Sequence, residues 1–134
     1  MNGIEWVIDA HGCDAEALRS PAALRSLFDR MIAGMLLRPV GETQWHQFPT
    51  TGGITGLCLL AESHIACHTF PEFSSLCLNV FCCVPRQPWD FAKALTAGFG
   101  ATSVTVQTVR RTYQETILET VAGPSHISPK SPIE

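Results

Sequence analysis

The chain has 134 residues, of which 46% are hydrophobic and 16% charged, and this composition is typical of a single globular domain. Its net charge of −3, without a basic run, argues against a nucleic-acid-binding surface. No apolar stretch approaches the ~20 residues of a membrane span, and the first residues lack the charged start and apolar run of a signal peptide, so we expect a cytoplasmic protein.

The first half of the chain predicts two strands on either side of a helix. Alternating apolar side chains predict a strand over residues 3–10. Ser20-Pro21 then begins a helix, because serine caps a helix N-terminus and proline is tolerated in its first turn. Apolar residues at helical spacing over positions 24–35 extend this helix to about 15 residues and mark its core-facing stripe. A second strand is expected over residues 43–48, before a loop at residues 49–53.

The second half of the chain is rich in strands. Apolar or alternating runs predict strands over residues 54–60, 65–70, 76–84 and 103–112, with a second helix over residues 89–99. Two helices and five or six strands indicate an α+β fold, a two-layer sandwich with both helices packed on one face of an antiparallel sheet. We expect residues 1–113 to form this domain and residues 114–134, which are rich in proline and serine, to be a disordered tail.

Six cysteines occur, and no two of them form a C-x-x-C pair, so neither a zinc ribbon nor a thioredoxin-like motif is indicated. In the cytoplasm they are expected to be reduced thiols. Cys58, Cys67 and Cys77 lie in apolar, strand-like runs and are expected to be small buried residues. Cys82 and Cys83 are adjacent, so on a strand only one of them can face a given site.

The segment AESHIACHTFPE, residues 61–72, is unusual for a strand-forming region. It places Glu62, Ser63, His64 and His68 among apolar residues, and polar groups are costly to bury unless they find partners. A lone histidine in such a place is usually a hydrogen-bonded core residue, and a lone serine is usually an ordinary residue at a strand edge. On the residues alone, that structural explanation and a functional site both stay open.

Several strings along the chain match one protein family in residue type and spacing. They are Gly12-Cys13-Asp14, His46-Gln47-Phe48, Gly53-Ile54-Thr55-Gly56, Glu62-Ser63-His64, Cys67-His68-Thr69-Phe70-Pro71-Glu72 and Asn79-Val80-Phe81-Cys82-Cys83-Val84. The family's spacing from Thr55 through Cys83 is kept without a gap. On these motifs, residues 4–112 resemble the proenzyme of pyruvoyl-dependent S-adenosylmethionine decarboxylase in its short prokaryotic form.

This resemblance implies that the chain cuts itself between Glu62 and Ser63. In the family the serine hydroxyl attacks the preceding carbonyl, so Ser63 Oγ would attack the Glu62 carbonyl and form an ester through an oxyanion intermediate. Thr55 stands where the family places the hydroxyl that donates to this oxyanion. His68 matches the base that removes the Ser63 Cα proton, a task that suits a neutral imidazole. The second fragment would then begin with a pyruvoyl cofactor made from Ser63.

The resemblance also implies the reaction of the cut enzyme. The pyruvoyl ketone forms a Schiff base with the substrate amine, and the adjoining carbonyl accepts electrons as carbon dioxide leaves. Cys83 matches the acid that reprotonates the product, and thiols, with an ordinary pKa of about 8.5, carry a proton at pH 7. Phe70 and Phe48 are candidates to bind the sulfonium cation of S-adenosylmethionine, and Glu72 is a candidate for its ribose hydroxyls. A homodimer is implied as well.

The chain departs from the family pattern at several positions. Thr55 replaces the usual serine, Asn79 the usual aspartate, Cys82-Cys83-Val84 the string T-C-G, and Ser74-Ser75 a Gly-aromatic pair, while Arg110-Arg111-Thr112 lacks a usual glycine. These changes bear on the substrate, which is S-adenosylmethionine for spermidine synthesis or, as an alternative, ornithine or arginine. An unprocessed regulatory homologue is a third interpretation, against which the intact Ser63, His68 and Cys83 argue.

Overall fold

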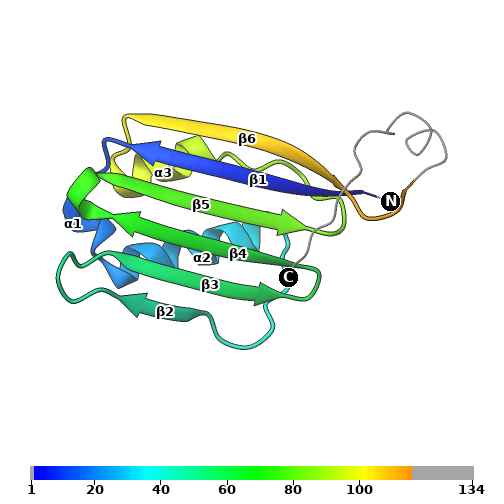
Figure 1. Ribbon diagram of the computed structural model, residues 1–134, viewed down its shortest axis with the longest axis horizontal. Helices are drawn as coiled ribbons and strands as arrows, with labels where there is room; N and C mark the ends of the chain where they lie inside the picture. Colours follow the sequence, from blue (N-terminus) through cyan, green and yellow to red (C-terminus); the bar gives the residue numbers. More distant parts are fainter. Residues whose placement is uncertain (1, 116–134) are drawn as a thin grey trace, which may run out of the picture.

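The computed structural model describes residues 2–115, which form a six-stranded antiparallel sheet with the helices on one of its faces (Figure 1). The strands lie in the order β2-β3-β4-β5-β1-β6. In chain order the elements are β1 (Asn2–His11), α1 (Ala15–Leu18), α2 (Pro21–Gly34), β2 (Gln44–Gln47), β3 (Ile54–Leu60), β4 (Ser63–Phe70), a 3-10 turn (Pro71–Phe73), β5 (Ser75–Cys82), α3 (Phe91–Phe99) and β6 (Ser103–Thr112). The α+β two-layer sandwich expected from the sequence is confirmed.

Side-chain caps begin the two longer helices. Ser20 Oγ accepts a hydrogen bond from the Ala23 amide at 3.1 Å and so caps α2, with a proline in the next position. Asp90 caps α3 by accepting from the Lys93 amide at 3.0 Å, so this helix begins two residues later than the sequence pattern predicts. Gly100, with a φ of +68°, ends α3 in the left-handed region that glycine adopts at low cost.

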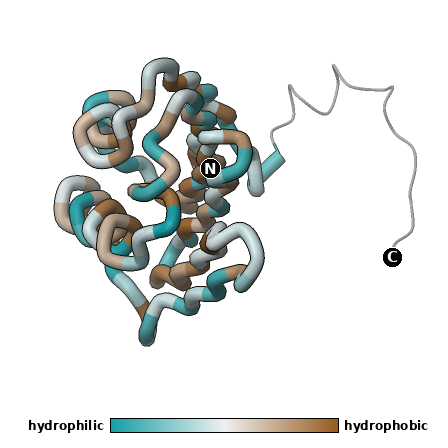
Figure 2. The backbone as a smooth tube through the Cα atoms, turned by 90° about the vertical axis from the view of Figure 1, so that its left-hand side faces the viewer, coloured by the Kyte–Doolittle hydropathy of each residue, from teal (hydrophilic) through white to brown (hydrophobic). Residues whose placement is uncertain are grey.

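The core lies between the sheet and the helices, which Figure 2 shows edge-on as two layers. Every second residue of the central strands points toward the helices and is buried. These residues are Trp6, Ile8 and Ala10 of β1, Ile65 and Cys67 of β4, and Leu76, Leu78 and Val80 of β5. They pack against the buried stripes of α2 (Leu24, Leu27, Phe28 and Met31) and α3 (Phe91, Ala94, Leu95 and Phe99). The prediction that the α2 stripe is core is confirmed.

The opposite face of the sheet carries no helix formed by residues 2–115 and is turned to the viewer in Figure 1; we call it the open face. It bears exposed apolar side chains, among them Leu57 (48% exposed) and Leu59 (59% exposed). Cys77 also is exposed, so the expectation that it is buried like Cys58 and Cys67 is wrong. The apolar neighbours of Cys77 point to the core, and the alternation of the strand turns the cysteine outward.

The strands predicted over residues 54–60 and 103–112 are confirmed to the residue. Strand β4 begins at Ser63, two residues earlier than predicted, which brings the predicted cleavage position to the start of the strand. Most of the tail predicted at residues 114–134 lies outside the described residues. None of the helices within residues 2–115 is long and apolar enough to cross a membrane.

Candidate active site

The peptide bond predicted to be cut lies in the turn between β3 and β4. Ser63 pairs with the last residue of β3, so Ala61 and Glu62 form a two-residue loop. The Glu62 carbonyl accepts a hydrogen bond from the Cys83 amide at 2.9 Å, and the Ala61 amide donates to the Arg38 carbonyl at 2.8 Å. Loop tips are usually poorly held, whereas this one is tied down on both sides. We call Glu62, Ser63 and Cys83 the turn site.

The backbone of this loop differs from the one that two-residue hairpins favour. Such hairpins prefer turns with positive φ, because these match the twist of the two strands. Among the described residues, the non-glycine positions with positive φ are Leu36 and Ser74, so neither Ala61 nor Glu62 has this conformation. The loop that contains the predicted cleavage position therefore fits the strand twist less well than the common hairpin turns do.

Two arginines hold the Glu62 side chain. Arg38 Nη2 lies 2.7 Å from Glu62 Oε2, and Arg86 Nη2 lies 3.3 Å from Glu62 Oε1. The hydrogen bond from Arg38, together with the positive charges of both arginines, lowers the pKa of the Glu62 carboxyl, while burial acts in the opposite direction. Arg86 is 22% exposed, and its Nε is buried without a hydrogen-bond partner within residues 2–115.

Ser63 and the two adjacent cysteines meet where β4 lies beside β5. Ser63 pairs with Cys82, and its hydroxyl is a hydrogen-bond partner of that thiol. Burial raises the pKa of the Cys82 thiol, and the hydrogen bond with Ser63 partly offsets this increase. Cys82 is buried and Cys83 is partly exposed. Both backbone groups of Cys83 are engaged, because its amide donates to Glu62 and its carbonyl accepts from the Tyr113 hydroxyl at 3.0 Å.

The remaining predicted site residues line one hollow of about 410 Å³, which we call the binding pocket. Its lining consists of Phe48, Thr50, Thr51, Thr55, His68, Thr69, Phe70 and Glu72. Thr55 Oγ1 lies 3.1 Å from His68 Nδ1, so one ring nitrogen of His68 is engaged and the other is the one that could take a proton. Phe48 (46% exposed) and Phe70 (36% exposed) offer aromatic faces to a ligand.

The loop that closes one side of the binding pocket is held by backbone contacts. The Gly52 amide donates to the Phe48 carbonyl at 2.9 Å, and Gly52 has a φ of +80°, which favours glycine. The Gln47 side-chain amide donates to the carbonyls of Gly52 and Arg19, at 3.0 Å and 2.9 Å. Arg19 Nε donates in turn to the Thr51 carbonyl at 3.0 Å. These bonds fix the position of Phe48 relative to the sheet.

The turn site and the binding pocket lie at opposite ends of β4. Ser63 is the first residue of this strand, and His68 is five positions further along. At about 3.3 Å per residue, their Cα atoms are about 16 Å apart. Thr55 is paired with His68 and is equally distant from the turn. The structure thus groups the predicted residues into two clusters, and within one chain neither Thr55 nor His68 can contact Ser63.

A polar network crosses the open face beside the turn site. His64 Nε2 lies 3.1 Å from Asn79 Oδ1, and the Asn79 amide donates to the Glu5 carboxylate. Arg111 Nη1 contacts the other oxygen of Glu5 at 2.6 Å. Phe81 stacks on the His64 ring at 5.6 Å and lies under the Arg111 guanidinium at 5.7 Å. The Asn79 hydrogen bond, and secondarily Arg111, lowers the pKa of Glu5 against an opposing effect of burial.

Asn79→Asp is expected to destabilise the fold at pH 7 by about 1–3 kcal/mol, the scale of a lost hydrogen bond to a charged group. The substitution turns the donor to Glu5 into a second carboxylate, and two such groups at contact favour protonation of one of them. Glu5 in the wild type has a lowered pKa, so its stabilising effect is present above its ordinary pKa of 4.5 and is lost as pH falls. The loss in free energy of unfolding that Asn79→Asp causes should therefore be smaller at pH 4 than at pH 7, as measured by urea unfolding at both pH values.

Asn79→Ala is the matched control, because it removes the donor without adding a charge. The loss in free energy of unfolding that Asn79→Ala causes should change less between pH 7 and pH 4 than the loss that Asn79→Asp causes. If Asn79→Asp lowers the free energy of unfolding equally at the two pH values, charge repulsion with Glu5 is not the cause of the destabilisation.

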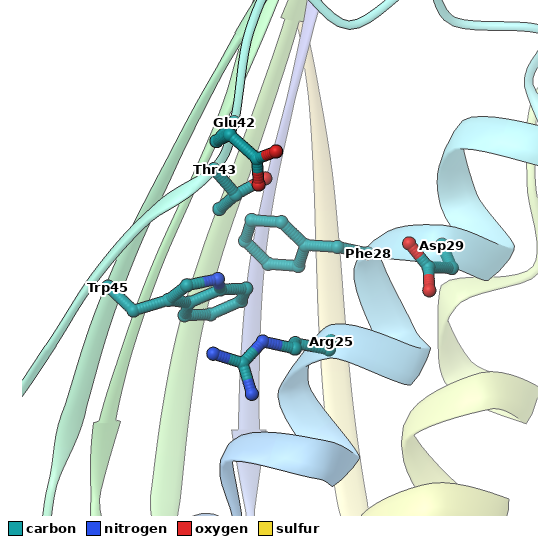
Figure 3. A pocket seen from close by; sticks show the side chains of 6 residues that line it. All are labelled: Arg25, Phe28, Asp29, Glu42, Thr43 and Trp45. Carbon is teal, nitrogen blue, oxygen red and sulfur yellow. The ribbon is translucent and has the colours of Figure 1, made fainter.

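A further hollow lies on the helix side, between α2 and the segment that leads into β2 (Figure 3). Phe28 and Trp45 pack there with ring centroids 4.8 Å apart, and Arg25 lies over the Trp45 ring at 5.8 Å. Asp29, Glu42 and Thr43 complete its lining. None of the residues singled out in the sequence lines this hollow, and we assign it no chemistry. Within residues 2–115 there is also no group of three or more His, Cys, Asp or Glu side chains arranged to hold a metal ion.

Sequence reasoning missed three side chains that contact the turn site. Cys82 is beside Ser63, a contact that depends on the pairing of β4 with β5. Arg38 lies 24 residues before Glu62 and Arg86 lies 24 residues after it, and no sequence motif indicates that either arginine contacts Glu62. A search for charges able to balance Glu62 would have included both arginines among several, without singling them out.

The sequence matches one known protein family along most of its described length. The sequence profile of the S-adenosylmethionine decarboxylase family matches residues 4–112. The S-adenosylmethionine decarboxylase proenzyme of Clostridium kluyveri is 30% identical over 125 residues, which cover 90% of this chain and 95% of the relative. The corresponding proenzyme of Acetivibrio thermocellus is 33% identical over 113 residues, which cover 81% of this chain and 87% of the relative.

A solved structure shows the same fold. The crystal structure of the adenosylmethionine decarboxylase from Aquifex aeolicus superposes with a TM-score of 0.71 at 24% sequence identity. The superposition covers 84% of this chain and 92% of that chain. On the match of the family profile and the identity to the two proenzymes, the chain belongs to the S-adenosylmethionine decarboxylase family of enzymes.

Proposed function

We propose that the chain is a proenzyme that cuts itself between Glu62 and Ser63, and then decarboxylates S-adenosylmethionine with the pyruvoyl group made from Ser63. The observation that supports this most directly is the hydrogen bond of 2.9 Å from the Cys83 amide to the Glu62 carbonyl. This carbonyl is the one that the Ser63 hydroxyl has to attack. A donor already aimed at its oxygen stabilises the negative charge that develops there.

In the proposed cleavage, Ser63 Oγ adds to the Glu62 carbonyl carbon, and the peptide C–N bond then breaks to leave an ester. Removal of the Ser63 Cα proton breaks the Cβ–Oγ bond, and Glu62 leaves as a carboxylate. Water then displaces the nitrogen of the former Ser63, which leaves as ammonia. The pyruvoyl group remains at the start of the second fragment. The turn site supplies the nucleophile and one oxyanion donor. A second donor, Thr55, and the base, His68, are in the binding pocket.

Thr55 and His68 can reach a turn site only in a second copy of the chain. A two-fold axis that pairs the open faces of two protomers would bring each end of β4 close to the opposite end in the partner. Each turn site would then meet the binding pocket of the other protomer. Pairing would also cover the exposed Leu57 and Leu59, and exposed apolar side chains gathered on one face are common at interfaces. We therefore propose a homodimer with two shared active sites.

For decarboxylation, the pyruvoyl group would supply the electron sink that side chains lack. The binding pocket would hold the substrate, with Phe48 and Phe70 against the sulfonium cation and the Glu72 carboxylate toward the ribose hydroxyls. Cys83 would deliver the proton that completes the product. The product would serve spermidine synthesis, as in the family.

Two other functions stay open to test. Ornithine and arginine carry cationic side chains that the same aromatic rings and Glu72 could bind, so a product assay should offer all three substrates to the purified protein. Carbon dioxide release from S-adenosylmethionine alone is the expected result, and release from ornithine or arginine instead would overturn the assignment. An unprocessed regulatory homologue is the remaining interpretation.

Mass spectrometry of the purified protein tests self-cleavage directly. We expect two fragments, residues 1–62 and residues 63–134, the second beginning with the pyruvoyl group. Ser63→Ala, which lacks the nucleophile, should remain a single chain and be inactive. A wild-type chain that stays intact after long incubation at neutral pH would exclude self-cleavage and favour the regulatory interpretation.

A further inference from the structure

The two arginines on Glu62 are not used by the steps described so far. We propose that Arg86, assisted by Arg38, stabilises the Glu62 carboxylate as it leaves Ser63. This inference rests on the proposed self-cleavage and concerns only its second step, the opening of the ester. Arg86 and Arg38 thereby act on the leaving group, and the Cys83 amide acts on the carbonyl that is attacked.

The chemistry of that step places new charge on Glu62. When the Ser63 Cα proton is removed, its electron pair forms the Cα=Cβ double bond. The Cβ–Oγ bond breaks, and its electrons stay on the ester oxygen, which becomes part of the Glu62 α-carboxylate. One neutral ester thus yields one anion at the residue whose side chain the arginines already contact. Groups that stabilise charge where it develops in a transition state lower the barrier.

The charges around the turn suit this task. Arg38 and Arg86 together carry two positive charges, and the Glu62 side chain compensates only one of them. A second carboxylate formed on the same residue would balance the cluster. Arginine binds carboxylates through several N–H groups at once, so one guanidinium can contact both the side-chain and the main-chain carboxylate of Glu62.

Arg86 has an unpaired N–H donor that is available to bind the new anion. Its Nε is buried and lacks a hydrogen-bond partner within residues 2–115. An unpaired buried donor costs free energy, and the proposed cleavage creates a new acceptor on the residue whose side chain Arg86 already contacts. Arg38 is more exposed, and its carbonyl also accepts from the Ala61 amide at 2.8 Å. Arg38 therefore positions the loop, whereas Arg86 is placed to stabilise the leaving group.

The test separates ester formation from ester opening. Full-length chains with Arg86→Met, Arg86→Lys or Arg38→Met are translated in a pulse-chase, and samples are treated with hydroxylamine at neutral pH. Hydroxylamine cuts an ester and leaves a hydroxamate on residue 62, which mass spectrometry distinguishes from the carboxylate of normal cleavage. Arg86→Met is expected to slow fragment formation about 100-fold and to accumulate hydroxylamine-sensitive ester. Arg86→Lys, which keeps the charge, and Arg38→Met should accumulate less.

Arg30→Met is the matched control, because Arg30 is exposed on α2, and this variant should be cut at the wild-type rate. Arg86→Met that is cut at the wild-type rate, or slowly without accumulating ester, would overturn the inference. If Arg86→Met does not fold, as judged by circular dichroism, an ester level in Arg86→Lys equal to the wild type would have the same consequence. A wild-type chain that is never cut refutes the proposed function instead, so the two failures are distinguishable.

Discussion

A one-to-one mixture of Ser63→Ala and His68→Ala chains is expected to regain about a quarter of the wild-type decarboxylase activity, although each variant alone has none. Ser63 and His68 lie at opposite ends of β4, so in the proposed homodimer each active site would take one residue from each protomer. In a mixed dimer, one site combines both substitutions and the other contains neither. Random pairing makes about half of the dimers mixed, each with one intact site of two.

Co-expression with two different affinity tags isolates the mixed dimer for measurement. Its mass spectrum should show the His68→Ala chain cut after residue 62 and the Ser63→Ala chain intact. The control mixture is Ser63→Ala with Cys83→Ala, two changes within the turn site, which leaves no site fully intact and should regain no activity. A monomeric mass by light scattering, or mixed dimers in which neither chain is cut, would contradict the shared site.

Cys83→Ala is expected to lower decarboxylation about 10²–10⁴-fold, the usual cost of losing a positioned acid, while self-cleavage continues. The two steps use different parts of the residue. The contact with the Glu62 carbonyl is made by the Cys83 amide, which alanine retains. In the proposed reaction the thiol is needed only later, to protonate the product at the correct carbon. Turnover numbers and the mass of the 63–134 fragment after exposure to substrate measure the two effects separately.

Cys82→Ala is the internal control for this prediction. Cys82 is buried beside Ser63, so its loss should cost stability, on the order of 1 kcal/mol, and leave most of the decarboxylation. A proton delivered to the wrong carbon in Cys83→Ala would convert the first residue of the 63–134 fragment to alanine, which the mass reveals. An inactive Cys82→Ala beside a fully active Cys83→Ala would reverse the roles assigned to the two thiols.

The sequence predicted the fold well because the decisive signals are local. Alternation defines the strands, as over residues 54–60 and 103–112, and Ser20 marks the start of α2 by its capping hydrogen bond. The misplaced Cys77 shows the limit of such patterns. An apolar run does not tell which of its members face the core, because that depends on the layer packed against the strand.

The candidate site was predicted as a set of residues but not as an arrangement. The motif strings named Ser63 and His68, and their positions on one strand already contain a constraint. An offset of five residues separates them by about 16 Å along the strand. Contacts such as Ser63 with Cys82, and Glu62 with its arginines, depend on strand pairing and on loops far away in the chain. No local pattern specifies these contacts.

The strand order β2-β3-β4-β5-β1-β6 determines what a cut at residue 62 does to the protein. The first fragment contributes β1, β2 and β3, and the second contributes β4, β5 and β6. Strand β1 is hydrogen-bonded between β5 and β6, so the two fragments interleave in one sheet and cannot separate without unfolding. Once unfolded, however, they are separate molecules that must find each other again. Refolding of the cut protein becomes bimolecular and slows on dilution, whereas an uncut Ser63→Ala protomer regains its sheet at a rate independent of concentration.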